Sequence, residues 1–148
     1  MENNNAIAQI SLKEMENELG YEIGMFNNTC KASNFFSNLD QFSRNLLIES
    51  LAAHTRVLVD FFYYDKKKYE NNDIIAQDLL PSNIVWSKLR PELPQILRDA
   101  KQKADKQLAH LTLDRIRLKR EDKHGWNFYA INQEMNKIIE CFYNVKNS

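Results

Sequence analysis

Apolar residues recur at alternating spacings of three and four positions over four long stretches of the chain. That spacing places them on one face of an α-helix. We therefore expect four amphipathic helices, at about 11–32, 39–64, 94–113 and 127–143. No stretch competes as a β-strand, which would alternate apolar and polar residues. The pattern predicts an all-α fold, an antiparallel helical bundle of four long helices plus a short helix in the middle connection.

Capping residues mark where three of these helices begin. Ser11 and Glu14 form a capping box, in which each side chain can satisfy an orphan backbone N–H. Asn38 and Asn127 are the expected N-caps of the second and fourth helices. Pro94 suits the first turn of the third helix, because its missing N–H would be unpaired there anyway.

The middle connection holds the expected short helix. Asp73 can cap a helix over 74–79, which Pro81 stops. Trp86 and Leu89 are expected to anchor an otherwise irregular stretch to the core.

Each long helix has a predicted apolar face that should build the core. Gly20 and Gly24 weaken the first helix, but they would also allow another helix to come close. The predicted faces, in chain order, are Leu12, Met15, Leu19, Ile23 and Phe26; Phe42, Leu46, Leu47, Leu51, His54, Leu58, Phe61 and Phe62; Leu97, Ala100, Ala104, Leu108 and Leu111; and Phe128, Ile131, Met135, Ile138 and Phe142.

Composition narrows the class of protein. The chain has 148 residues, of which 43% are hydrophobic and 27% charged, and this balance suits one globular domain over 1–148. Three Gly and three Pro are too few for the many turns of a β-sandwich. There is no CxxC pair, no secretory leader pattern and no long apolar stretch, so we expect a cytoplasmic protein with no membrane contact.

The zero net charge hides an uneven distribution. Residues 1–40 hold six acids and two bases, a balance of −4. Residues 98–123 hold nine bases and five acids, a balance of +4. A non-specific polycation is thus excluded, whereas a local phosphate site on the third helix stays open.

The third helix carries the first candidate site. One polar stripe of this helix aligns His110 with Lys103, Lys106, Asp114 and Arg117. His110 and Asp114 are one turn apart and can hydrogen-bond, which would fix the histidine tautomer. The stripe is either a solvated charged face or a phosphate-handling site, in which the histidine moves a proton and the cations stabilise negative charge.

The second helix carries another candidate residue, Arg56. Ala52 and Ala53 lie one turn before it and leave room for a neighbouring helix. Asp60 and Glu49 can pair with Arg56 along the helix. Arg56 is either a partly buried structural residue or a phosphate-binding residue that these carboxylates orient.

The other histidines have simpler interpretations. His54 lies among apolar neighbours, where a packed histidine with one hydrogen bond competes with a role in a site. His124 precedes Gly125 in an expected turn. No histidine, cysteine or carboxylate spacing is diagnostic of a metal, and no phosphate-loop motif occurs, so we expect neither a metal nor a cofactor.

Two runs of sequence resemble a known family. Residues 45–62, with Glu49, His54 and Arg56, and residues 105–112, with His110, followed by Gly125-Trp126, look like bacterial HEPN (higher eukaryotes and prokaryotes nucleotide-binding) domains. The similarity is to the abortive-infection U-type branch, and it covers about residues 12–142.

The resemblance implies a helical domain that dimerises and acts on RNA. Active members of the family are metal-independent ribonucleases with an Arg a few residues before a His. Carried onto this chain, His110 is the motif histidine, but Lys103 stands where an Arg would fit and lacks the planar fork that grips phosphate. Arg56 of the second helix could supply the missing guanidinium if the fold brings it close to His110. Arg117 and His124 match the motif spacing, but one Arg and one His at this spacing also occur easily by chance.

Three hypotheses follow from these patterns. The first is a homodimeric ribonuclease in a phage-defence or toxin–antitoxin setting, with a possible protein antitoxin as partner. Its catalytic residues would be His110, Arg56, Glu49 and Lys106, and its substrate-binding residues Lys103, Asp114, Arg117 and His54. The second is a non-catalytic dimeric module that binds RNA, a nucleotide or a protein. The third is a purely structural or regulatory bundle.

Overall fold

The structure, a computed structural model, describes residues 10–65, 72–108, 113, 116–117 and 125–148. These described residues form helices and connections, with no β-strand among them. The all-α prediction is therefore confirmed for this part of the chain. In chain order the elements are α1 (Leu12–Ala32), the 3₁₀ helix η1 (Ser33–Asn38), α2 (Gln41–Tyr63), the 3₁₀ helix η3 (Ala76–Leu79), α3 (Trp86–Leu89), α4 (Gln95–Leu108) and α6 (Phe128–Lys146).

The first helix begins as its sequence predicts. The Glu14 backbone N–H donates to the Ser11 hydroxyl at 3.2 Å, and the Ser11 backbone N–H donates to the Glu14 carboxylate at 2.7 Å. Two of the orphan donors at this helix end are thereby satisfied. These hydrogen bonds lower the pKa of Glu14, because they stabilise its ionised form.

The N-cap predicted for the second helix is wrong. Asn38 ends the 3₁₀ helix η1, and α2 begins after Asp40, whose carboxylate accepts a hydrogen bond from the Ser43 backbone N–H at 2.7 Å. Arg44 fixes the corner by donating to the Phe36 and Ser37 carbonyls. Asp40 caps better because a carboxylate accepts a stronger, charge-assisted hydrogen bond than an amide.

The middle connection is also capped differently from the prediction. Asp78, at the third position of η3, accepts from the Ile75 backbone N–H at 3.0 Å, whereas the predicted cap, Asp73, lies outside this short helix. Trp86 is buried, as predicted, in the one-turn helix α3. The prediction for Leu89 is wrong, because its side chain is 52% exposed.

One carbonyl at the end of α2 ties this connection to the long helices. The Phe62 carbonyl accepts from the Trp86 indole N–H at 2.7 Å and from Arg90 Nη1 at 3.1 Å. Carbonyls in the last turn of a helix have no partner within the helix, so these side chains satisfy an otherwise unpaired group. Side-chain hydrogen bonds from Trp86 and Arg90 thus hold α3 and the start of the segment that leads to α4 against the end of α2.

The last helix has the predicted cap but runs further. Gly125 adopts a φ of 58°, which suits glycine, and the Asn127 side chain then accepts from the Ala130 backbone N–H. The predicted end was at about residue 143, but α6 continues to Lys146, whose ammonium contacts Glu16 of α1 at 2.5 Å. The predicted end of the third helix near residue 113 falls partly outside the described residues.

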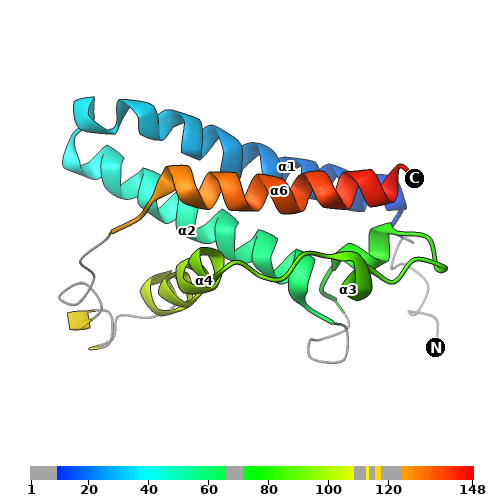
Figure 1. Ribbon diagram of the computed structural model, residues 1–148. Helices are drawn as coiled ribbons and strands as arrows, with labels where there is room; N and C mark the ends of the chain where they lie inside the picture. Colours follow the sequence, from blue (N-terminus) through cyan, green and yellow to red (C-terminus); the bar gives the residue numbers. More distant parts are fainter. Residues whose placement is uncertain (1–9, 66–71, 109–112, 114–115, 118–124) are drawn as a thin grey trace, which may run out of the picture.

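The first helix, α1, runs antiparallel to both α2 and α6. Thr29 pairs with Ser50 and Glu22 with His54, so α1 and α2 run in opposite directions. Asn27 of α1 accepts a hydrogen bond from Asn136 of α6, and Glu16 of α1 contacts Lys146 of α6. The earlier residue of α1 meets the later residue of α6, so these two helices also run in opposite directions. In Figure 1, α1 and α6 lie side by side, with α2 next to them and α4 beside α2.

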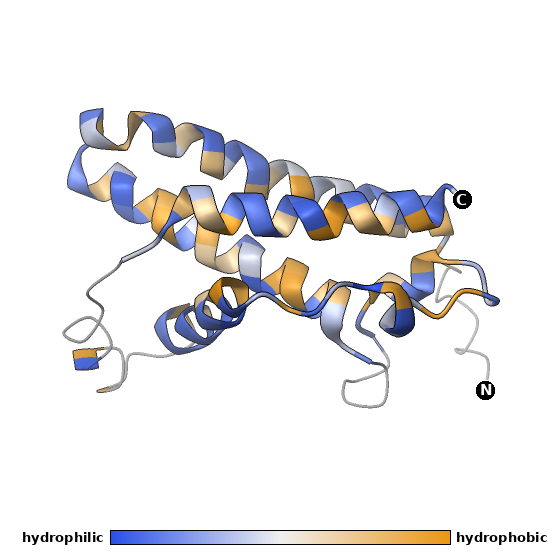
Figure 2. Ribbon diagram, viewed as in Figure 1, coloured by the Kyte–Doolittle hydropathy of each residue, from blue (hydrophilic) through white to orange (hydrophobic). Residues whose placement is uncertain are grey.

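The core lies where the long helices and the middle connection meet. Its aromatic centre is Phe142, which is fully buried and makes edge contacts with Phe61, Phe62 and Trp86. In Figure 2 the apolar residues of α6 form a broken stripe among polar ones. The predicted face residues that are buried are Leu19, Phe26, Leu51, Leu58, Phe61, Phe62, Leu97, Ala100, Ala104, Ile131, Met135, Ile138 and Phe142.

Some predicted core positions are exposed instead. Phe42 is 70% exposed and Leu46 49%, and the first turns of α2 extend past α4 and α6, which lie along its later turns (Figure 1). Leu12 and Leu108, at helix ends, are exposed too. The close approach expected at Gly20 and Gly24 is absent, since a Cβ built at either position would meet no atom within 4 Å among the described residues.

Among the helices that the structure describes, none is both long enough and apolar enough to cross a membrane.

Candidate functional site

A cluster of charged side chains joins α2 to α4. Arg56 Nε lies 2.8 Å from Asp105 Oδ1, and Lys101 Nζ lies 2.8 Å from Asp105 Oδ2 and 3.4 Å from Asp60 Oδ1. Arg56 and Asp60 are one turn apart on α2, as Lys101 and Asp105 are on α4. The two helices therefore meet through alternating charges, and Arg56 already has an anionic partner within the chain.

Burial affects the ionisation of this cluster. Loss of contact with water raises the pKa of Asp60, although Lys101 and a hydrogen bond from Tyr64 oppose the shift. The pKa of Lys101 is also raised, because its hydrogen bond and ion pairs with Asp105 and Asp60 outweigh its own desolvation. Burial thus disfavours the charged form of Asp60.

A second polar contact links α1 to α2. His54 Nδ1 lies 2.6 Å from Glu22 Oε2, and both side chains are largely buried. The Tyr21 ring meets the His54 ring edge-on at 6.3 Å. About two helical turns away, Thr29 and Ser50 share a hydrogen bond at 2.7 Å. The interpretation of His54 as a packed histidine with one hydrogen bond is consistent with this geometry.

The remaining predicted residues are only partly described. Lys103 Nζ donates to the Gly125 carbonyl at 2.8 Å and lies 4.9 Å from the centre of the Trp126 ring. Lys103 therefore links α4 to the residues just before α6. Lys106, Glu49 and Arg117 are exposed. His110, Asp114 and His124 lie outside the described residues.

The described candidates do not gather at one point. Arg56 contacts α4 through Asp105, whereas His54 contacts α1 through Glu22, so they serve opposite neighbours of α2. Arg56 was expected to pair with Asp60 and Glu49 along its own helix, yet its partner is Asp105, and Asp60 pairs with Lys101. Ion pairs between packed helices replace those pairs, because Asp105 lies directly opposite Arg56.

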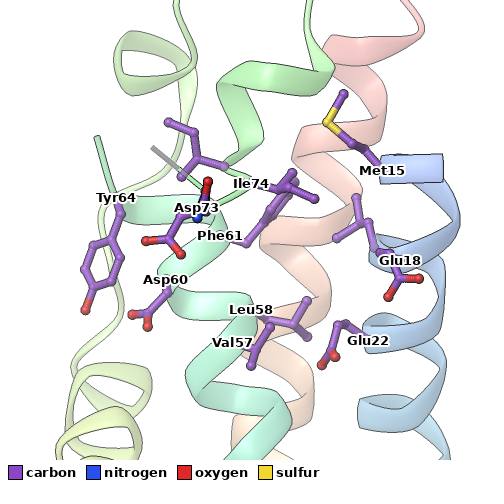
Figure 3. Close-up of a pocket in the computed structure, with 13 residues that line it drawn as sticks. Met15, Glu18, Glu22, Val57, Leu58, Asp60, Phe61, Tyr64, Asp73 and Ile74 are labelled. Carbon is purple, nitrogen blue, oxygen red and sulfur yellow. The ribbon is translucent and has the colours of Figure 1, made fainter. Parts of the chain in front are cut away.

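A cavity of about 390 Å³ opens between α1, α2 and residues 72–75 (Figure 3). Glu18 and Glu22 of α1 and Asp60 of α2 are among the residues that line it. The residues that line it are Met15, Glu18, Leu19, Glu22, Val57, Leu58, Asp60, Phe61, Tyr64, Asn72, Asp73, Ile74 and Ile75. It therefore combines an apolar floor with several carboxylates.

Metal coordination finds little support in this part of the chain. No group of three or more His, Cys, Asp or Glu side chains in the described ranges is arranged to hold a metal ion. Cys30 is buried and forms no disulfide, and burial raises its pKa to about 11. A thiol with that pKa is protonated at neutral pH and is a poor metal ligand or nucleophile.

The sequence patterns missed the partners that matter most. Asp105, Glu22 and Lys101 were not singled out as contacts of the α2 residues, since contacts between helices leave no fixed spacing in the chain. Ala52 and Ala53, beside Arg56, were the available signal: they indicated that another helix comes close, and α4 lies there. Nothing in the spacing of Glu18 and Asp73 indicated that they share a cavity.

No family model, no curated protein and no solved structure matches this chain.

Proposed function

We propose that this chain is a HEPN-like four-helix bundle that works as a non-catalytic, homodimeric binding module in the cytoplasm. The observation that carries this proposal is the ion pair that Arg56, a candidate catalytic residue, forms with Asp105 of α4. His54, a candidate substrate-binding residue, contacts Glu22 on the opposite side of α2. A ribonuclease needs its proton-transfer group and its phosphate-binding cation at one substrate position.

The proposed dimer would form through the first turns of α2. Phe42 and Leu46 are one turn apart and are 70% and 49% exposed. Large apolar side chains that are exposed together mark interaction surfaces more often than isolated ones do. A second copy of this surface would remove both from water, since two-fold dimers pair like with like.

The dimer is tested by light scattering after size-exclusion chromatography. The native chain, of 17.5 kDa, should elute with twice that mass, and a Phe42→Ser, Leu46→Ser variant should be monomeric. Leu89→Ser is the matched control, because Leu89 is 52% exposed in α3, which lies at the opposite end of the fold from the first turns of α2 (Figure 1). A native monomer would contradict this part of the proposal.

A metal-independent ribonuclease is the second candidate. The positive balance of residues 98–123, nine bases against five acids, favours it, and so does His110 within that stretch. The 2′-hydroxyl of RNA would attack the adjacent phosphate, with His110 transferring the proton and Lys106 or Arg56 stabilising the charge.

RNA cleavage separates the two candidates. The purified protein is incubated with tRNA and with structured and unstructured RNAs in the presence of EDTA, and the products are resolved on a gel. The binding-module proposal predicts no cleavage and allows a mobility shift that weakens as salt rises. Cleavage by the native chain that His110→Ala abolishes, with the helical circular dichroism unchanged, would establish the ribonuclease instead.

A further inference from the structure

The cavity between α1 and α2 has a buried apolar floor. Leu58 is fully buried, and Leu19, Phe61 and Ile75 are each less than 10% exposed. Met15, Val57 and Ile74 complete seven apolar side chains around it. A volume of about 390 Å³ lies in the range of small-molecule sites, which are mainly apolar with a few polar groups that set orientation.

The polar part of the cavity carries charge of one sign. Glu18, Glu22, Asp60 and Asp73 line it, and no Lys, Arg or His belongs to the lining that the structure describes. These carboxylates come from α1, α2 and the segment before η3, so three parts of the fold place negative charge around one space (Figure 3).

Side chains outside the cavity engage two of these four carboxylates. Lys101 contacts Asp60 from the α4 side at 3.4 Å, and His54 Nδ1 lies 2.6 Å from Glu22 Oε2. Glu18 and Asp73 are exposed at the edge of the cavity. A ligand that brings a positive charge would therefore meet an excess of carboxylates, in a space where burial already disfavours the ionised form of Asp60.

We propose that this cavity binds a small organic ammonium ion with an apolar body, which lies on the floor formed by Leu19, Leu58 and Phe61 while the ammonium pairs with the exposed carboxylates at the edge, Glu18 and Asp73. The apolar floor disfavours a hydrated metal ion, and it disfavours a polyamine that is charged along its whole length. The negative charge of the lining would repel an anionic ligand, and a neutral ligand would gain no attraction from it. This inference goes beyond the proposed binding module and is independent of dimerisation and of RNA.

The ligand class is tested with 2-phenylethylamine, which is an ammonium ion at pH 7, against 2-phenylethanol, which has nearly the same shape and no charge. Binding is followed by amide chemical shifts in ¹⁵N-labelled full-length protein. The amine should bind saturably and shift the amides of Val57 and Ile74. The alcohol should bind at least about tenfold more weakly, a difference of about 1.4 kcal/mol. Equal binding of the two, or no binding of the amine, would overturn the proposal.

Substitutions test whether the ligand depends on the carboxylates that line the cavity. A Glu18→Gln, Asp73→Asn variant keeps the shape of the cavity and removes two carboxylates at exposed positions, so it should fold normally and bind the amine about tenfold more weakly. Glu92→Gln, together with Glu134→Gln, is the matched control, because it removes the same charge outside the lining. An equal loss of affinity in the control would show only a general charge effect and would reject the site.

A last variant examines the neighbouring lysines. Lys66, Lys67 and Lys68 follow soon after Tyr64 in the sequence and lie outside the described residues. Replacing all three with serine should leave the affinity for the amine unchanged or higher. Loss of binding in this variant would contradict a site made by the described lining. The outcomes of the dimerisation and RNA experiments do not affect these measurements of amine binding. The ligand proposal and the proposed function can therefore fail separately.

Discussion

Arg56 on α2 and Asp105 on α4 form an ion pair, with 2.8 Å between Nε and Oδ1. They are separated by 49 positions in the chain (105 − 56), and the fold brings them together because α2 and α4 lie side by side in opposite directions. The same pair decides how Arg56 is interpreted. An acid of the neighbouring helix partly balances the charge of the guanidinium, which favours the structural interpretation of Arg56 over phosphate binding.

The stability that this ion pair adds should be small. Arg56 and Asp105 are 44% and 37% exposed, so water screens much of their attraction. In a double-mutant cycle with Arg56→Met and Asp105→Asn, we expect a coupling free energy of about 0.2–1 kcal/mol. The free energy of unfolding is measured by urea denaturation of the four proteins. A coupling above about 2 kcal/mol would indicate that the pair is far more desolvated than its exposure implies.

Phe142 should contribute the largest single share of core stability among the aromatic residues. Its ring is fully buried and contacts Phe61, Phe62 and Trp86. Phe142→Ala should lower the free energy of unfolding by about 3–5 kcal/mol, because it leaves a cavity in the core. Phe35→Ala, at a residue 63% exposed, should change it by less than about 0.5 kcal/mol in the same urea experiment. Similar losses in both variants would contradict the placement of the core.

The two cysteines should differ in reactivity. Burial raises the pKa of Cys30 to about 11, so at pH 8 only about one thiol in a thousand is ionised there. Cys141 is more accessible, although its Sγ lies 3.9 Å from the Leu89 carbonyl. We expect iodoacetamide to label Cys141 at least about tenfold faster than Cys30, because the thiolate is the reacting form. Mass spectrometry of peptides after timed quenching measures both rates, and Cys141→Ser isolates the slow one. Faster labelling of Cys30 would be inconsistent with its burial.

The raised pKa of Asp60 predicts a dependence of stability on pH. Desolvation makes the folded state bind this proton more tightly than the unfolded chain does. The contribution of Asp60 to stability is therefore fully present below its unfolded pKa, about 3.9, and is lost as the pH rises through the higher folded value. Relative to the native protein, Asp60→Asn should gain stability as the pH increases from about 3.5 to 7.

The measurement for Asp60 is a set of urea titrations of both proteins across that pH range. Lys101 keeps its contact with Asp105 in the variant, so the cluster is not left with an unpaired ammonium. A difference in unfolding free energy that stays constant with pH, or that moves in the native protein's favour as the pH rises, would show that Asp60 has no raised pKa.

Local signals in the sequence determined where most helices lie. The capping box of Ser11 and Glu14 and the Asn127 cap act within one turn, so the residues alone identify them. The periodic apolar positions of α6 are buried as their spacing predicts, from Ile131 to Phe142. Where two polar residues compete over a short distance, as Asn38 and Asp40 do, the local pattern was not decisive, and the stronger acceptor became the cap.

Tertiary structure alone decided which side chains meet. The exposure of Phe42 and Leu46 depends on how far the neighbouring helices extend along α2. The spacing of apolar residues in the sequence carries no information about that extent. The partners of Arg56 and His54, Asp105 and Glu22, come from different helices, and the cavity joins carboxylates from α1, α2 and the middle connection. Helix formation depends on neighbours within a few positions of the chain, and the sequence by itself can determine it. A site depends on contacts between distant segments, and these exist only once the helices have packed.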